Sequence, residues 1–155
     1  MKKLIAYFSP SGNTKAMAEK LAKATGADLF EIKPQTPYTR ADLDWTNKNS
    51  RSSVEMNDKS YRPQIAQLPN SLANYDTIFI GFPIWWYVAP TIINTFVENV
   101  DLDGKKVIPF ATSGGSGMGK TLANLKPSCP GANWVEGKVI NGMSEKALAY
   151  WAEKL

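Results

Sequence analysis

Leu4-Ile5-Ala6-Tyr7-Phe8 runs directly into Ser9-Pro10-Ser11-Gly12-Asn13-Thr14, and this junction of an apolar run with an uncharged polar loop decides the fold. A helical pattern begins at Thr14, so the loop joins a buried strand to a helix. Hydroxyl and backbone N–H groups donate to anions, Gly12 allows close backbone approach, and a helix N-terminus adds its positive dipole end. The loop therefore suits a phosphate group, and the alternative is an ordinary cluster of helix-capping residues.

Composition is typical of a globular protein of one domain. The chain has 155 residues, of which 43% are hydrophobic and 21% charged, and this length is enough to bury a substantial core. The net charge of +4 comes from basic side chains that form no dense tract, whereas nucleic-acid-binding proteins usually cluster them in a stripe. We therefore expect a single domain over residues 1–155 that does not bind nucleic acid.

The counts of cysteine and histidine exclude several kinds of site. Cys129 is the only cysteine in the sequence, which excludes an intramolecular disulfide, a CxxC redox pair and a four-cysteine iron–sulfur site. The sequence has no histidine, so we expect neither a zinc site nor a histidine-based catalytic triad. Any redox chemistry must then come from a bound organic cofactor.

One stretch without charge, Thr77–Val97, is long enough to span a bilayer. Gly81, Pro83 and Pro90 interrupt it, and they divide it into a strand, a loop and a helix rather than one continuous helix. The apolar run at the N-terminus is too short for a signal peptide. We expect no membrane insertion and a cytoplasmic location.

Five short apolar runs predict strands that are buried on both faces of a parallel sheet. They are Lys3–Phe8, Leu29–Lys33, Thr77–Phe82, Lys106–Ala111 and Asn133–Ile140. Helical patterns lie between most of them, and a last one runs to the end of the chain; they start at Thr14, Pro90, Gly119 and Ser144. The alternation predicts an α/β fold, a doubly wound five-stranded parallel sheet with helices on both faces, whose ligands bind beyond the carboxyl ends of the strands.

The segment of about residues 34–69 departs from this alternation, because it is polar with scattered aromatic residues. Thr39 is suited to capping a helix that reaches Trp45, and Ser50–Asp58 suits a second helical stretch. We interpret the segment as an elaborated crossover between the second and third strands. A surface excursion is the interpretation that we favour; the alternative is that part of it covers a cofactor or shapes a partner surface.

Two further loops follow the third and fourth predicted strands. The first holds three consecutive large aromatic residues, Trp85-Trp86-Tyr87, and one strand cannot bury all three on one face. Offset stacking makes such residues suited to a flat ligand, with packing in a core or a dimer contact as the alternative. The second loop, Thr112–Gly119, is rich in glycine, which allows its N–H groups to approach a ligand edge closely.

Residues Gly114–Thr121 also match the phosphate-binding pattern GxxxxGK[ST] of nucleotide triphosphatases. Such an enzyme needs an apolar strand ending in an aspartate that holds Mg²⁺. Only 34 residues follow Thr121, and they contain no such strand. We therefore do not expect a nucleotide triphosphatase, and we expect no metal site.

Together the three loops resemble those of flavodoxin-like proteins that bind FMN. The resemblance covers nearly the whole chain and implies the strand order 2-1-3-4-5 and FMN as cofactor. It implies that the FMN phosphate binds to Ser9, Ser11, Gly12, Asn13 and Thr14. It also implies that the isoalloxazine ring lies between the two later loops, against Pro83, Ile84, Trp85, Trp86, Tyr87, Thr112, Ser113, Gly114, Gly115 and Gly117.

The resemblance implies an electron-transfer protein that cycles FMN between oxidised, semiquinone and hydroquinone states, and we favour this function. The two later loops are also similar to those of NAD(P)H:quinone reductases of the same fold, so an FMN-dependent NAD(P)H:quinone oxidoreductase is the alternative. Those enzymes often use histidine or tyrosine near the glycine-rich loop, and this chain has no histidine. A non-redox FMN-binding module is a third hypothesis.

Partners are open at this point. The best-known flavodoxins are strongly acidic and dock basic partners, whereas this chain is basic, with an isoelectric point near 9.1. The redox partner protein therefore cannot be inferred from the resemblance. NAD(P)H and quinone are partners only under the reductase alternative, and the choice between monomer and homodimer stays open.

Overall fold

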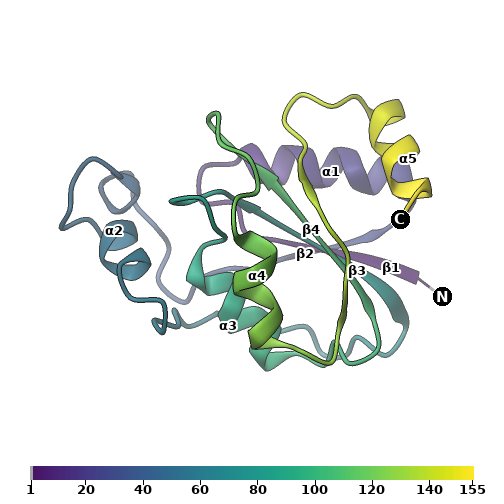
Figure 1. Cartoon of the computed structure of the whole chain (residues 1–155), viewed down its shortest axis with the longest axis horizontal. Helices are drawn as coiled ribbons and strands as arrows, with labels where there is room; N and C mark the ends of the chain where they lie inside the picture. The colour runs from purple at the N-terminus through teal and green to yellow at the C-terminus, as the bar shows by residue number, and fades with distance from the viewer. Residues whose placement is uncertain (1) are drawn as a thin grey trace.

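A computed structural model describes residues 2–155 and shows a parallel sheet with the strand order β2-β1-β3-β4-β5, as predicted. The bounds of the strands are β1 (Lys2–Tyr7), β2 (Asp28–Glu31), β3 (Tyr75–Pro83), β4 (Lys106–Thr112), β5 (Asn133–Trp134) and β6 (Lys138–Val139). All strand pairs in this sheet are parallel. The carboxyl ends of the strands consequently lie at one edge, and connecting loops meet there (Figure 1).

Helices cover both faces of the sheet, so the predicted α/β class and doubly wound arrangement are confirmed (Figure 1). Helices α1 (Asn13–Thr25) and α5 (Glu145–Glu153) pack together on one face. The other face carries α3 (Thr91–Asn99), α4 (Thr121–Leu125) and the 3₁₀ turn η2 (Lys126–Ser128). Between residues 2 and 155, no helix is both long enough and apolar enough to cross a membrane.

The predicted fifth strand, Asn133–Ile140, is interrupted in the structure. Both β5 and β6 pair with β4, but Lys106 faces Asn133 whereas Phe110 faces Lys138, so the partner of β4 contains one extra residue. The interruption lies opposite Pro109, which has no N–H to donate to the ladder. At Gly137 the backbone comes so close to the Pro109 carbonyl that a Cβ would overlap it, which is why a glycine stands there.

The second predicted strand is shorter and less buried than expected. It spans Asp28–Glu31 rather than Leu29–Lys33, and Leu29 is 43% exposed. The reason is its place at the edge of the sheet, where it pairs only with β1. Burial on both faces holds instead for the central strand β3, because Ile78 and Ile80 are fully buried on one face and Phe79 is buried on the other.

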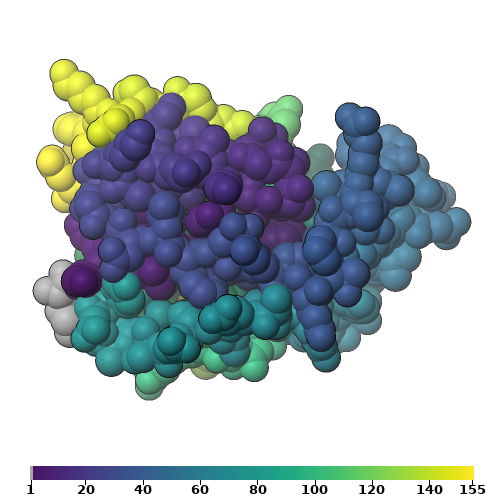
Figure 2. Space-filling view, turned by 180° about the vertical axis from the view of Figure 1, so that it is seen from behind, coloured from purple at the N-terminus to yellow at the C-terminus, as the bar shows by residue number. Residues whose placement is uncertain are grey.

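The crossover forms an arm that projects beyond the carboxyl edge of the sheet (Figures 1 and 2). It contains a 3₁₀ turn η1 (Ala41–Leu43) and a short helix α2 (Arg51–Met56) in place of the two longer helical stretches predicted. The N-cap residue of the first element is Arg40 rather than the predicted Thr39, although the Thr39 hydroxyl accepts the Asp42 N–H at 3.1 Å. The element stops early because Asp44 accepts the Thr46 N–H, and such local side-chain bonds compete with a helix.

We predict that Gly81→Ala destabilises the fold. The Phe110 ring of β4 covers Gly81 of β3, and a Cβ at this glycine would overlap the ring. Overpacking of this kind typically costs about 1–3 kcal/mol of unfolding free energy, which chemical denaturation would measure. Gly117→Ala is the matched control because its Cβ would enter open space; equal stability of the two variants would contradict the prediction.

Candidate functional site

The loops that follow β1, β3 and β4 meet at one pocket of about 550 Å³. A pocket of this volume is typical of small-molecule sites, which range over roughly 300–1,000 Å³. Ten of the predicted site residues line it: Ser11, Asn13, Pro83, Ile84, Trp85, Trp86, Tyr87, Thr112, Ser113 and Gly114. Five others stand in the same loops without lining it, namely Ser9, Gly12, Thr14, Gly115 and Gly117. The sequence therefore predicted where the three loops converge.

The loop after β1 ends in a set of free backbone donors. Gly12 has a φ of 92°, a left-handed conformation that favours glycine, and it precedes the first turn of α1. Among residues 2–155, no hydrogen bond uses the N–H groups of Ser11, Gly12, Asn13 or Thr14. Free N–H groups at a helix N-terminus form a ready anion site, so this loop fits a phosphate.

Two hydroxyls of the same loop have structural partners instead. The Ser9 hydroxyl accepts the Lys15 N–H at 2.9 Å, which closes the loop onto the first turn of α1. The Thr14 hydroxyl is 2.8 Å from that of Thr112 in a buried contact between α1 and β4. These bonds shape the loop, and they leave its unpaired backbone N–H groups as the donors that could bind an anion.

The loop after β3 is a tight turn with unusual backbone angles. Trp85 and Val88 exchange two backbone hydrogen bonds of 3.0 and 3.2 Å around the turn. The two residues between them, Trp86 and Tyr87, have φ angles of 51° and 67°. Left-handed backbone at a bulky residue costs about 1–2 kcal/mol, and strain of this kind is concentrated at functional sites.

The three aromatic side chains of this turn have different environments. Trp85 packs edge-on against Phe8 and Tyr38, with ring centroids 5.7 Å apart in both pairs. Trp86 and Tyr87 are 45% and 67% exposed although both line the pocket. The available faces for a flat ligand are therefore those of Trp86 and Tyr87, whereas Trp85 supports the turn from beneath.

The glycine-rich loop after β4 is held by a residue far along the chain. The Asn141 side chain accepts the Ser113 N–H at 2.8 Å and donates to the Ser113 carbonyl at 2.9 Å. The same loop supports the aromatic turn, because the Lys120 N–H donates to the Tyr87 carbonyl at 3.2 Å. A Cβ on Gly119 would overlap that carbonyl, so glycine is required for this contact.

Comparison with known families identifies the chain over nearly its whole length. A family model for flavodoxin matches residues 2–155. The chain belongs to the flavodoxin family. At Gly114–Thr121, which matches the nucleotide triphosphatase pattern, Thr121 is fully buried and its hydroxyl donates to the Met118 carbonyl, so it is not presented to a metal ion.

Solved structures and a curated relative support this assignment. A protein of Bacteroides eggerthii is 54% identical, with a TM-score of 0.95 over 99% of this chain and 96% of its own. A flavoprotein of Lactobacillus acidophilus in complex with FMN is 28% identical, with a TM-score of 0.71 over 97% and 98%. The uncharacterised NAD(P)H oxidoreductase YcaK of Escherichia coli is 30% identical over 98 residues, 63% of this chain but only 45% of that protein.

Sequence analysis missed several residues that line the pocket of this flavodoxin. They are Leu43, Trp45, Ser52, Ser116 and Asn141. Three of them come from the crossover, so part of the arm lies at this pocket. The one available signal was Trp45, a large aromatic residue in a polar segment.

A buried carboxylate holds the arm in this position. Glu55 of α2 is 2% exposed, accepts a short hydrogen bond from the Tyr38 hydroxyl and pairs with Arg51 at 3.0 Å. The Arg51 guanidinium also lies 3.8 Å from the centre of the Tyr38 ring. Burial, followed by the hydrogen bond to Glu55, raises the pKa of Tyr38, so the phenol stays protonated and keeps donating.

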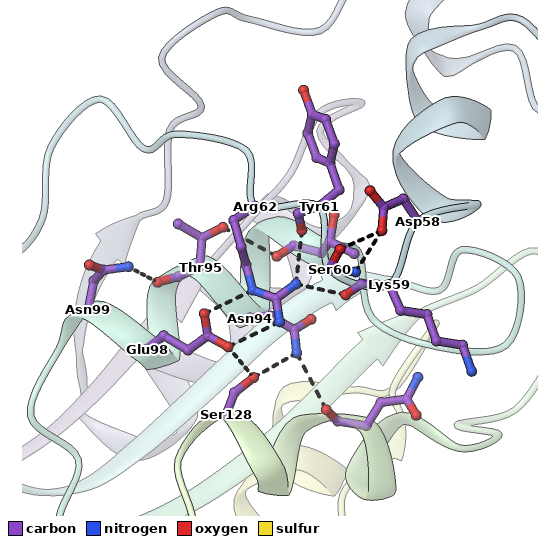
Figure 3. A network of polar contacts seen from close by, with 12 residues as sticks. Asp58, Lys59, Ser60, Tyr61, Arg62, Asn94, Thr95, Glu98, Asn99 and Ser128 are labelled. Atoms are coloured by element: carbon purple, nitrogen blue, oxygen red, sulfur yellow. Dashed lines mark hydrogen bonds and ion pairs between the residues drawn. The ribbon is translucent and has the colours of Figure 1, made fainter.

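A second network fastens the returning end of the arm to α3 (Figure 3). Arg62 binds Glu98 through two hydrogen bonds of 2.9 and 3.1 Å and also donates to the Lys59 carbonyl. Ser128 donates to Glu98 at 2.7 Å, and Asn94 donates to Ser128 at 3.0 Å. These contacts join three segments that are far apart in the sequence: the end of the arm, α3 and η2.

We predict that the Arg62–Glu98 network makes stability depend on pH. The hydrogen bond from Arg62 lowers the pKa of Glu98 below its ordinary value of 4.5. The stabilisation that ionised Glu98 adds to the folded state is therefore complete above pH 4.5 and is lost as the pH falls through the lowered pKa. Between pH 7 and pH 3 the melting temperature should fall less in Glu98→Gln than in the wild type, because the variant has no carboxylate to protonate at this position.

Glu153→Gln serves as the control for this prediction, because Glu153 is an exposed carboxylate at the end of α5 with no ion pair among residues 2–155. This variant should follow the wild-type curve. Identical pH dependence of all three proteins would show that the network does not contribute.

Proposed function

We propose that this flavodoxin-family protein binds FMN noncovalently in the pocket at the carboxyl edge of the sheet and uses it to transfer electrons. The observation that carries the proposal is the pairing of two unlike features in one pocket. Free N–H groups of the β1 loop at Ser11 and Asn13 suit a phosphate, and the exposed faces of Trp86 and Tyr87 suit a flat ring. The FMN in the Lactobacillus acidophilus relative supports this cofactor.

Bound FMN would supply one-electron and two-electron redox chemistry. The protein contributes binding and positioning. Backbone N–H groups from Ser11 to Thr14 bind the phosphate and, with the dipole of α1, offset its charge without a lysine or arginine within the loop. Asn141 holds the Ser113 backbone in the glycine-rich loop, and the strained turn presents Trp86 at the ring.

An electron carrier is the form of this function that we favour, as the flavodoxin resemblance implies. The Trp86 and Tyr87 residues are 45% and 67% exposed, so the ring would lie near the surface and accessible to a partner protein. This exposure suits transfer of electrons through an exposed edge.

A specific observation favours the second candidate, an FMN-dependent NAD(P)H:quinone oxidoreductase. Leu43, Trp45 and Ser52 of the arm line the pocket, which adds a wall beside the aromatic turn where a planar substrate would be enclosed. Trp45 is 72% exposed and is free to cover such a substrate. The name of the Escherichia coli relative points in the same direction.

One spectroscopic experiment tests the proposal and separates the two candidates. The purified protein is incubated with FMN and desalted, and its visible absorption is recorded. Flavin bands retained at about one FMN per chain would support the binding proposal, and a colourless protein would reject it. NADPH is then added without a partner protein: rapid bleaching indicates the reductase, and a stable spectrum that a chemical reductant bleaches reversibly indicates the carrier.

We predict that Trp86→Ala weakens FMN binding by roughly tenfold or more, equivalent to about 1.4 kcal/mol. The reason is the loss of a stacking face at the pocket, and fluorescence titration of the flavin would measure the change. Tyr150→Ala is the control, since Tyr150 is 61% exposed on α5 and away from the pocket. Unchanged FMN affinity in Trp86→Ala would remove this tryptophan from the site.

A further inference from the structure

A second pocket of about 770 Å³ lies beside the proposed FMN pocket, and the proposed function does not use it. We call it the flank pocket. It is bounded by α3, by residues 119–128, by the returning end of the arm from Met56 to Arg62, and by the aromatic turn. The two pockets share only Trp86 and Tyr87, so the strained turn is the wall between them.

The flank pocket has an excess of positive charge. Arg62 is neutralised by its pairing with Glu98 at 2.9 Å (Figure 3). Lys59 and Lys120 also line the pocket, and within residues 2–155 neither forms an ion pair. Two free cations and no free carboxylate in the lining favour a ligand that carries negative charge.

Thr91 supplies an independent indication of a polar ligand atom. Thr91 is 6% exposed and lines the flank pocket. Among the described residues, its hydroxyl is the one buried side-chain polar atom that has no hydrogen-bond partner. Buried polar groups are nearly always paired. Thr91 is also the first residue of α3, which has nine residues, so the positive end of a helix dipole lies at the same place.

Besides the polar residues Asn94, Asn124 and Ser128, the lining includes apolar surface, and hydrogen bonds already fix the sides of the pocket. Met56, Val88, Ala123 and Pro127 contribute aliphatic surface, and Trp86 and Tyr87 contribute aromatic surface. The Arg62–Glu98–Ser128 network fixes the two sides of the pocket relative to each other (Figure 3). An apolar cavity with a few convergent polar groups is the usual form of a small-molecule site.

We propose that the flank pocket binds a small aromatic carboxylate. The carboxylate is attracted by Lys59 and Lys120, and the Thr91 hydroxyl at the N-terminus of α3, which is covered in the unliganded chain, rotates to donate to it. The ring system lies against the apolar wall next to Trp86. This ligand class satisfies the charge, the unpaired hydroxyl and the aromatic lining together, and an inorganic anion would leave the apolar surface unused.

The test uses 2-naphthoate as the probe and isothermal calorimetry on the FMN-loaded protein, with 2-naphthamide as the uncharged compound of the same shape. We expect one naphthoate per chain and weaker binding of the amide by about tenfold or more, because a hydrogen bond to a charged group is the stronger one. Equal binding of the two compounds, or no binding of naphthoate, would overturn the proposal.

Variants locate the binding site. Lys59→Gln combined with Lys120→Gln should weaken naphthoate binding by about tenfold, with FMN affinity unchanged. Lys146→Gln on α5, an exposed lysine on the opposite face of the sheet, is the control and should have no effect. A double variant that binds naphthoate as the wild type does would contradict the assignment.

Thr91→Val tests separately whether the hydroxyl binds the ligand, and its melting temperature shows whether the variant is folded. The substitution keeps the shape and removes an unpaired buried polar atom, so the melting temperature should not fall. Naphthoate binding should nevertheless weaken about tenfold. Undiminished binding would exclude Thr91 as a ligand contact and refute the proposal as stated.

Repeating the titration without FMN separates this inference from the proposed function. If the chain does not bind FMN but binds naphthoate with dependence on Lys59 and Lys120, the proposed FMN function is wrong and the flank-pocket proposal is supported. If FMN binds and naphthoate displaces it one for one, the probe occupies the first pocket and the flank-pocket proposal is wrong.

Discussion

The parallel pairing of β1, β3 and β4 is the constraint on which the rest of the structure depends. β3 pairs with both neighbours in continuous register from Thr77 to Gly81, and its side chains are buried on both faces. Because all three strands end at one edge, loops from distant parts of the sequence meet there. The buried contact between the Thr14 and Thr112 hydroxyls ties α1 to the end of β4. A slip of one residue in either pairing would separate these groups and move each core side chain to the opposite face of the sheet, where it would not fit its neighbours.

The Trp85–Val88 turn follows β3 and lies where these loops meet. The neighbouring Ile84 N–H donates to the Thr112 carbonyl at 2.9 Å, Trp85 and Val88 bond each other, and Lys120 donates to the Tyr87 carbonyl. These surrounding bonds offset the cost of left-handed backbone at Trp86 and Tyr87, which would otherwise relax. The result is a rigid wall that presents aromatic surface to two pockets. A ligand in either pocket therefore contacts a turn that has little freedom to move away from it.

Local patterns in the sequence indicated the sheet, its order and the three converging loops, because apolar runs and turn residues are local signals. The remaining site residues depend on long-range events. Asn141 reaches Ser113 only because β6 resumes pairing with β4 beyond Pro109. A proline within the apolar run Lys106–Ala111 is the sequence signal of that break. Trp45 and Ser52 reach the pocket through the folding of the arm, which no periodicity in residues 34–69 shows. Short polar elements that stop at side-chain bonds, as at Asp44, carry no repeating pattern to read.

The arm is more than a surface excursion, because it supplies walls to both pockets. Its outer part, from Leu43 to Ser52, lines the proposed FMN pocket, and its returning part, from Met56 to Arg62, lines the flank pocket. A buried carboxylate such as Glu55 is costly unless its partners are well placed, and Tyr38 and Arg51 are placed on it. Such a group contributes little net stability but permits one arrangement of the arm, and the Arg62–Glu98 pair secures the other end. Polar contacts of the arm thus help to set the geometry of both pockets: the Glu55 contacts lie outside the first pocket, whereas the Arg62–Glu98 pair is part of the lining of the second.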